Sequence, residues 1–186
     1  VLAKHMGYEP IPLSRDHWDM ALNPAFGESL IQNIKPDLVI SSAAYTNVDE
    51  AEDNEETAFL TNAVAPKYLA RGCKGLNIPI FHISTDYVFD GLKAEPYNES
   101  DHVNPINVYG RTKLAGELAI KEEIEKCIIL RISWVFSKEG RNFVNTITEL
   151  AKSRDLINVI DDQIGGPVSA VCVANVLMQL AGEHKE

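Results

Sequence analysis

Long apolar runs are missing from this 186-residue sequence. None reaches the roughly 18 residues that a membrane-spanning helix needs, so a membrane is not an expected partner. Cysteine is scarce as well: Cys73, Cys127 and Cys172 lie far apart, which argues against a disulfide framework and suits a reducing compartment. The five histidines are scattered without the spacing of metal ligands, and we therefore expect no metal site built from them.

Positive charge is also in short supply. Lys and Arg number 17 against 27 Asp and Glu, which gives a net charge of −10, and no basic stripe stands out. Because nucleic acids are bound largely by neutralising their phosphates, nucleic acid is not an expected partner. Residues 1–7 lack a starting Met and are too short and polar for a signal peptide. We therefore expect a cytoplasmic protein whose sequence here begins inside a longer chain.

Short apolar runs alternate with segments of helical periodicity along the chain. We expect strands at residues 37–41, 79–84, 127–132 and 156–160, and helices at 55–72, 105–123, 142–152 and 170–181. Strands that alternate with helices of this length are joined by right-handed crossovers into a parallel sheet covered on both faces. The prediction is an α/β doubly wound fold. Ligands of such folds bind beyond the carboxyl ends of the strands, where function is therefore to be sought.

Three residues at such positions have complementary chemistry. Thr85 follows the expected strand 79–84, while Tyr109 and Lys113 are four residues apart and share one face of a helix. A tyrosine with a pKa of about 10 is a poor acid, and a nearby ammonium lowers that pKa. Together with a hydroxyl that holds a substrate carbonyl, the set suits proton delivery to a ketone as hydride reaches its carbon. Such a pair also arises by chance on helices, so the wider sequence pattern has to decide.

That wider pattern is specific. It consists of residues 43–52, 62–63, 84–91, 104–117, 131–136, 140–144 and 162–167. With these segments in order over nearly its whole length, the chain resembles the dTDP-4-dehydrorhamnose reductases of the extended short-chain dehydrogenase/reductase superfamily. The resemblance implies a Rossmann-like sheet and an oxidoreductase that uses NADPH or NADH. It would reduce the 4-keto group of the nucleotide-sugar dTDP-4-dehydro-6-deoxy-L-mannose to give dTDP-L-rhamnose.

The resemblance also implies roles for individual residues. The catalytic residues are Thr85, which orients the keto group, Tyr109, the proton donor, and Lys113, which lowers the pKa of Tyr109. The cofactor-binding residues are Asp19, Met20, Ala43, Ala44, Tyr45, Tyr109 and Lys113, and the substrate-binding residues are Thr85, Asp86 and Trp134. Arg131 would support the floor of the site, whereas Asn62 has either a structural or a catalytic role. Some relatives use magnesium at a subunit contact, so magnesium and a homodimer are further candidates.

The chain departs from this family at both ends. The family opens with a strand and a Gly-rich turn that cradles the cofactor pyrophosphate, and no glycine cluster stands near the start here. Residues 1–7 resemble the end of the following helix and residues 8–13 the second strand. The family also continues well past residue 186. We therefore expect residues 1–186 to form a partial NAD(P)-binding Rossmann-like domain that lacks most of the C-terminal substrate lobe, with the substrate-binding part beginning near 137–170.

Other functions remain open at this point. A sugar-nucleotide epimerase or dehydratase of the same superfamily is one; dehydratases usually carry an acidic pair beside the threonine, whereas Thr85 is followed by Asp86 and Tyr87. A non-catalytic regulatory subunit of methionine adenosyltransferase is another. The cofactor preference is equally open, because Arg15 would suit a 2′-phosphate whereas Asp19 would suit a free ribose.

Overall fold

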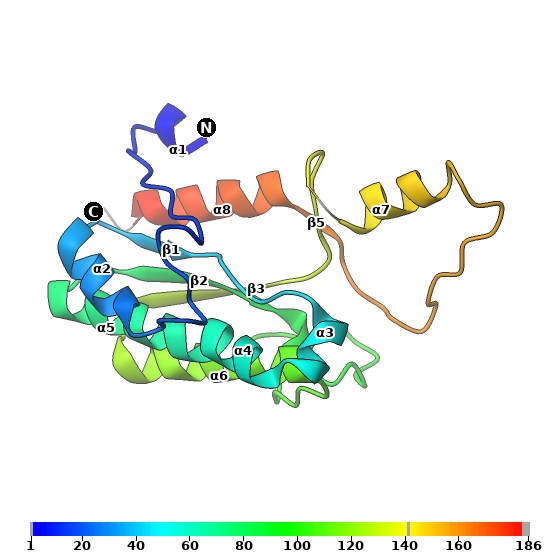
Figure 1. Cartoon of the computed structure of the whole chain (residues 1–186), viewed down its shortest axis with the longest axis horizontal. Coiled ribbons are helices and arrows are strands. Elements are labelled where there is room, and N and C mark those ends of the chain that lie inside the picture. The colour runs from blue at the N-terminus through cyan, green and yellow to red at the C-terminus, as the bar shows by residue number, and fades with distance from the viewer. Residues whose placement is uncertain (1, 141, 184–186) are drawn as a thin grey trace. The chain divides into compact units, whose positions relative to one another are not determined.

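A computed structural model describes residues 2–140 and 142–183 (Figure 1). Arg141, in segment 140–144 of the pattern above, and Val1, the first of residues 1–7, lie outside the described residues, as do residues 184–186. The chain divides into two compact units, residues 11–131 and residues 1–10 together with 132–186. No helix among the described residues is long and apolar enough to span a bilayer.

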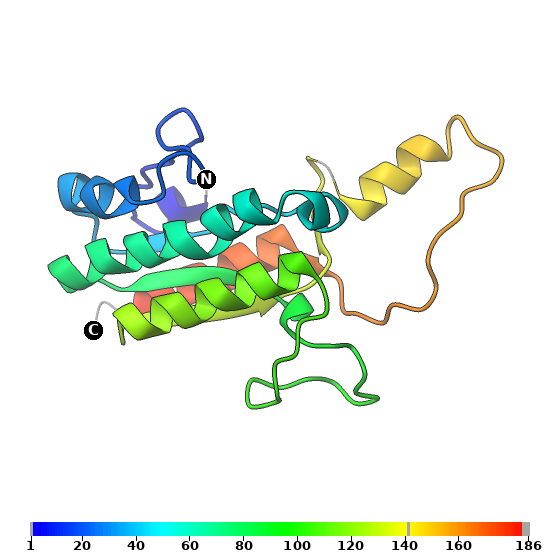
Figure 2. The same ribbon diagram turned by 60° about the horizontal axis from the view of Figure 1, so that its bottom comes forward.

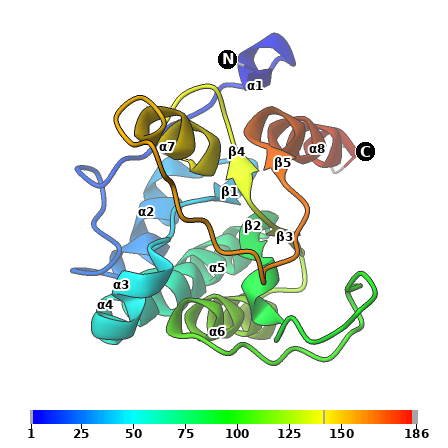
Figure 3. The same cartoon turned by 90° about the vertical axis from the view of Figure 1, so that its right-hand side faces the viewer.

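The unit of residues 11–131 is built on a three-stranded sheet. Its strands are β1 (Val39–Ser41), β2 (Ile80–Thr85) and β3 (Cys127–Ile132), in the spatial order β1-β2-β3. Strands β1 and β2 pair in parallel, with Ser41 opposite His82. Helices α2 (Phe26–Ile34), α5 (Ala65–Leu76) and α6 (Val108–Glu123) lie on one face of this sheet (Figure 3). The α/β class predicted from the alternating pattern is confirmed. Covering of the second face stays a prediction.

Figure 2 shows α5 and α6 side by side across the sheet. Apolar side chains of these helices pack with those of the sheet. The buried core cluster consists of Ile31, Val39, Leu69, Ala70, Cys73, Ile80, Ile120 and Ile124. Burial raises the pKa of the Cys73 thiol to about 12, so this cysteine serves as a small core side chain rather than as a thiolate. This core holds β2 against α6, the two elements that carry the polar residues of interest.

The helical stretch expected at residues 55–72 is present but not uniform. After α3 (Val48–Asp53) it runs through α4 (Glu55–Phe59), a π-helical turn η1 (Leu60–Val64) and α5. Pro66, in the first turn of α5, has no backbone N–H with which to bond the carbonyl four residues earlier, that of Asn62. The wider turn η1 lies directly before this proline, and π-helical turns are frequent at functional sites.

The unit of residues 1–10 and 132–186 is smaller. It contains α1 (Leu2–His5), α7 (Phe143–Leu150), α8 (Ala170–Glu183) and a two-stranded parallel ladder of β4 (Val135–Phe136) with β5 (Val168–Ser169). The helices predicted at 142–152 and 170–181 are confirmed. The β4–β5 ladder was not expected, because strands of two residues carry no readable alternation. Where a substrate-binding part begins stays a prediction.

Two expected strands are wrong. Residues 8–13 have no regular structure, and Pro10 and Pro12 explain why, since neither can donate a ladder hydrogen bond. Residues 156–160 are also irregular, and Leu156 and Ile160 are exposed. An apolar run becomes a strand only where a neighbouring strand pairs with it, and no ladder with this run is formed among the described residues.

Candidate active site

The polar residues of the unit 11–131 gather where β2 ends and α6 begins. The helix start is fixed by two acceptors: the side chain of Asn107 accepts from Gly110 N at 2.7 Å, and that of Glu52 accepts from Val108 N at 2.8 Å. Both satisfy amides that have no partner inside the helix. The first turn of α6, which carries Tyr109, is thereby held in place from α3 and from its own cap.

Thr85 terminates β2 and caps the short 3₁₀ turn η2 (Asp86–Val88). Its hydroxyl accepts from Tyr87 N at 3.2 Å and donates to Asp86 Oδ1 at 3.1 Å. Helix α6 sits directly on this turn at Gly110, where a Cβ would lie 2.2 Å from the Tyr87 carbonyl oxygen. The Tyr87 and Tyr109 rings meet edge to face, 5.7 Å between centroids. This close approach brings Tyr109 to Thr85.

Burial is the main influence on the Tyr109 phenol and raises its pKa above the ordinary value. A hydrogen bond with the Thr85 side chain opposes that shift, whereas the negative charge of Asp86 adds to it. The pKa of Asp86 is itself raised, again chiefly by burial. Tyr109 therefore keeps its proton at neutral pH and lies beside a hydroxyl that can orient a carbonyl.

Lys113 lies one turn farther along α6 and is 2% exposed. Its Nζ donates to the Ile83 carbonyl oxygen at 2.6 Å and lies 3.1 Å from His82 Nε2. Burial lowers the Lys113 pKa to about 8, against an opposing pull from the Glu117 carboxylate. The groups that shift the Tyr109 pKa are Thr85, Asp86 and Tyr87. The predicted lowering of the Tyr109 pKa by Lys113 thus stays a prediction.

Asn62 joins the loop after β1 to helix α6. Its side chain accepts from Tyr45 N at 2.8 Å and donates to Tyr45 O at 3.1 Å and to Thr112 Oγ1 at 3.0 Å. Thr112 in turn donates to the Tyr109 carbonyl at 2.9 Å. The buried amide thus supplies a structural role, and it ties the loop Ala43–Tyr45 to the turn that carries Tyr109.

A charged pair lies farther along the same elements. Arg131 donates to both carboxylate oxygens of Glu117, at 2.9 and 2.6 Å, and Ser84 donates to Glu117 Oε1 at 2.5 Å. The Arg131 guanidinium also lies over the Phe89 ring, 5.1 Å from its centroid. A bidentate pair of this kind is geometrically rigid. The arrangement fits the supporting role expected for Arg131.

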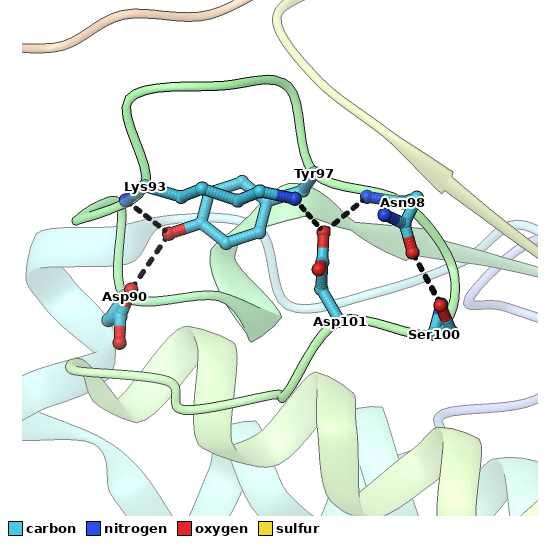
Figure 4. A network of polar contacts seen from close by, with 6 residues as sticks. All are labelled: Asp90, Lys93, Tyr97, Asn98, Ser100 and Asp101. Atoms are coloured by element: carbon cyan, nitrogen blue, oxygen red, sulfur yellow. Dashed lines mark hydrogen bonds and ion pairs between the residues drawn. The ribbon is translucent and has the colours of Figure 1, made fainter.

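The loop between η2 and α6 is ordered by its own polar contacts (Figure 4). Asp90 accepts from the Tyr97 hydroxyl at 2.8 Å and, beyond the residues drawn there, from Asn104 Nδ2 at 3.1 Å. Lys93 and Asp101 form an ion pair at 2.6 Å. The Tyr97 ring stacks on Phe89, with centroids 4.2 Å apart. Asp90 also accepts from Leu92 N, and its hydrogen bonds with Leu92, Tyr97 and Asn104 lower its pKa to about 2. The loop therefore returns to α6 along a defined path.

Asp19 and Met20 lie in the loop before α2. Both Ala21 N and Leu22 N donate to Asp19 Oδ1, at 2.9 and 3.0 Å, and Arg15 Nε lies 3.5 Å from its other oxygen. Met20 is buried. Arg15, which would suit NADPH, and Asp19, which would suit NADH, thus pair with each other. Cofactor binding by Asp19 and Met20 stays a prediction.

Trp134 belongs to the other unit. It has left-handed backbone geometry, with φ of 45°, and is 44% exposed. Its ring lies against Gly165, where a Cβ would come within 2.8 Å of Trp134 Cε2. Nearby, Ser133 Oγ donates to Gly166 O at 2.6 Å. Trp134 is therefore not buried among the described residues of its unit, while its role in binding a sugar stays a prediction.

The sequence reasoning missed His82, Ser84 and Glu117, and passed over Ser41. The sequence did contain a signal. His82 and Ser84 are two residues apart and share one face of a strand, while Lys113 and Glu117 are four apart and share one face of a helix. Among the described residues, no group of three or more His, Cys, Asp or Glu side chains could hold a metal ion.

Comparisons with known proteins show the family and the fold of the chain. The family described as "RmlD substrate binding domain" matches residues 2–186. A dTDP-4-dehydrorhamnose reductase of Sinorhizobium fredii is 43% identical over 173 residues, which cover 93% of this chain and 58% of that protein.

Two solved structures titled dTDP-4-dehydrorhamnose reductase also match. That from Clostridium acetobutylicum has a TM-score of 0.92 and 38% identity, covering 98% of this chain and 64% of that one. That from Bacillus anthracis, in complex with NADP, has a TM-score of 0.89 and 36% identity, covering 95% and 62%. The chain thus has the Rossmann-like fold of these enzymes and spans less than two thirds of their length.

Proposed function

Because the chain belongs to the RmlD substrate binding domain family, we propose that it is part of an NAD(P)H-dependent dTDP-4-dehydrorhamnose reductase. The reaction is reduction of the 4-keto group of dTDP-4-dehydro-6-deoxy-L-mannose to dTDP-L-rhamnose, in the biosynthesis of this nucleotide-sugar. The observation that carries the proposal is the contact of Thr85 with a protonated, partly buried Tyr109, one helical turn from Lys113.

The nicotinamide end of the cofactor would be held by residues that the structure ties together. Ala43, Ala44 and Tyr45 form the loop after β1, and Asn62 clamps that loop to the turn carrying Tyr109. When bound, the cofactor supplies the hydride. Two small residues in succession at a strand end allow a flat ring to approach the backbone, which supports the fit. Asp19 and Met20 would border the adenine end.

The chain's own residues would then handle the proton. With substrate bound, Thr85 would turn its hydroxyl proton from Asp86 Oδ1 to the keto oxygen, and Tyr109 would deliver its proton to the same oxygen as the carbon is reduced. Lys113, whose pKa of about 8 leaves it largely protonated at neutral pH, stabilises the phenolate that results. Asp86 and Trp134 would contact the sugar. As part of this proposal, the enzyme acts in the cytoplasm and as a homodimer.

Epimerases and dehydratases share the fold but are less well supported. The relatives with identities of 38–43% are named as reductases, and Asp86 beside Thr85 is followed by Tyr87 rather than by a second acid. The regulatory-subunit reading is weakened by the complete set of Thr85, Tyr109 and Lys113.

The decisive variant is Tyr109→Phe, in the enzyme that contains this chain. Only the proton-donating hydroxyl is removed, so turnover should fall by roughly 100-fold or more, the usual contribution of general acid catalysis. Cofactor affinity should change little. Tyr68→Phe, which removes a hydroxyl from α5, serves as the matched control. Near-normal turnover of Tyr109→Phe, measured by the loss of reduced nicotinamide absorbance, would remove Tyr109 from the mechanism.

A further inference from the structure

A buried polar seam joins β2 to α6. It consists of His82 and Ser84 on the strand and Lys113 and Glu117 on the helix, paired as His82 with Lys113 and Ser84 with Glu117. All four side chains are buried. Helix α6 runs antiparallel to β2, because Gly110 lies against Tyr87 beyond the end of the strand and Ile120 packs in the core with Ile80 at its start. The two pairs therefore cross in the space between helix and strand.

The two halves of the seam differ in charge. The buried Glu117 carboxylate accepts hydrogen bonds from two nitrogens of the Arg131 guanidinium, on β3, so its negative charge is paired. The Lys113 ammonium instead contacts two neutral acceptors, Ile83 O and His82 Nε2. A buried ammonium is costly unless hydrogen-bonded, so these two acceptors help Lys113 to keep its charge, beside the attraction of the nearby Glu117 carboxylate.

The contact of Lys113 fixes the state of the His82 ring. An ammonium only donates, so Nε2 must be unprotonated, and a neutral imidazole then carries its proton on Nδ1. That nitrogen lies 3.1 Å from Ser41 Oγ, on the residue opposite His82 in the parallel register. Protonation of the ring would turn Nε2 into a donor that faces another donor.

We propose that His82 is a positioning residue of this site: as a neutral imidazole anchored by Ser41, it holds the Lys113 ammonium against the Ile83 carbonyl, one turn from Tyr109. The inference rests on the proposed function, because it assigns the charge of Lys113 a role there. The charged groups around it are Lys113 itself and, along the seam, Glu117 with Arg131. The alternative is a histidine that merely fills the core.

The two readings differ in how Lys113 titrates. We would label the histidines and lysines of the full-length protein isotopically. NMR at a series of pH values then follows the signals of the imidazole rings and of the lysine ammonium groups. The proposal expects the His82 proton on Nδ1 throughout the neutral range. In His82→Leu the acceptor is lost, and the Lys113 pKa should fall by about one pH unit or more. His82→Gln keeps an acceptor and should restore most of that shift.

Two further variants sharpen the test. Ser41→Ala removes the anchor and should lower the Lys113 pKa by less than His82→Leu does. His102→Gln, at an exposed histidine, is the matched control and should leave that pKa unchanged. If His82→Leu fails to fold, the tautomer in the parent protein and the behaviour of Ser41→Ala still decide. A proton on Nε2, or an unchanged Lys113 pKa in a folded His82→Leu protein, overturns the proposal.

Failure of the proposed function gives a different result. If Lys113→Met leaves turnover intact, the catalytic reading of this site fails while the His82–Lys113 contact stands. If both are right, the pH at which turnover changes in the parent enzyme should shift in His82→Leu together with the Lys113 pKa. If the Lys113 pKa shifts in His82→Leu while the pH dependence of turnover does not, the role of His82 is limited to a structural contact.

Discussion

Tyr109 and Lys113 have pKa values that burial moves in opposite directions, upward for the phenol and downward to about 8 for the ammonium. Burial penalises whichever form is charged, so both shifts have one cause. At pH 7 each group still carries its proton. Tyr109 is thus poised as an acid, and Lys113 is the group of the two that begins to lose its charge as the pH rises through about 8. Both pKa shifts therefore depend on how deeply the first turns of α6, which carry Tyr109 and Lys113, are buried.

Trp134 provides a residue-scale prediction. Its exposed ring and left-handed backbone place it at the surface of its unit, where its apolar face and indole N–H suit a deoxysugar. Trp134→Ala should therefore raise the KM for the sugar nucleotide with little loss of stability. A core tryptophan would instead cost about 3–5 kcal/mol on truncation.

Substrate titration and a thermal melt on the same Trp134→Ala protein separate the two cases. Phe143→Ala, at another exposed aromatic of this unit, is a suitable control and should leave both quantities near normal. A large drop in Tm with an unchanged KM would contradict the binding role.

At this scale the sequence predicted part of the site. Thr85 and Tyr109 were expected to meet, and the structure brings them together because strand end and helix start are both sharply defined. His82 and Ser41 were not singled out, since a histidine and a serine inside apolar runs look like core residues. Their partnership depends on the register of β1 with β2, which no local pattern encodes.

Among the elements, α6 is the one whose placement decides the site. Its Gly116 lies against η1, where a Cβ would come 2.1 Å from the Asn62 carbonyl oxygen. That contact is with backbone, which cannot move aside cheaply. Gly116→Ala should therefore destabilise the protein by about 1–3 kcal/mol, the usual cost of overpacking, and should disturb the Asn62 clamp.

The control is Gly75→Ala in α5, where a Cβ would meet nothing within 4 Å. Alanine is the better helix former, so this variant should be neutral or more stable by up to about 1 kcal/mol. Urea unfolding of both proteins measures the difference. Equal stabilities for the two variants would mean that α6 does not depend on this close approach.

Long elements were the predictable ones. The alternating pattern predicted α5, α6 and α8, and in α5 the buried face includes Ala65 and Leu69 of the predicted apolar face. Residues 8–13 and 156–160 were wrong as strands because apolar composition alone supplies no pairing partner. The π-turn η1 was not foreseen, although Pro66 inside a helical pattern marks the place.

For the molecule as a whole, buried His82 makes the free energy of unfolding depend on pH in the acidic range. Burial, and secondarily the Lys113 charge, lower the His82 pKa from 6.5 to about 3. Between these values the unfolded chain binds a proton that the folded chain does not, so stability falls as the pH drops below about 6.5. The slope contributed is about 1.4 kcal/mol per pH unit.

The matched comparison is His82→Gln, which cannot titrate there. Carboxylates such as Asp90, whose lowered pKa acts in the same sense, contribute equally to both proteins and cancel. Urea unfolding at a series of pH values from 4 to 6 should show a shallower slope for the variant, by about one proton. Parallel slopes would mean that His82 is protonated in the folded state.

Cofactor affinity depends on how both ends of the dinucleotide are held. In the proposed function, the loop Ala43–Tyr45, tied to the turn of Tyr109, would hold the nicotinamide end, but no helix among the described residues begins with a Gly-rich turn that could receive the pyrophosphate. Such a turn contributes both backbone hydrogen bonds and the favourable end of a helix dipole. The 186-residue chain alone should therefore bind NADPH and NADH weakly, with a Kd well above about 1 μM. The Bacillus anthracis reductase, solved with NADP, is the natural comparison in the same calorimeter. Binding by the chain as tight as that of this relative would show that Ala43–Tyr45 and α6 suffice, and that the pyrophosphate cradle adds little.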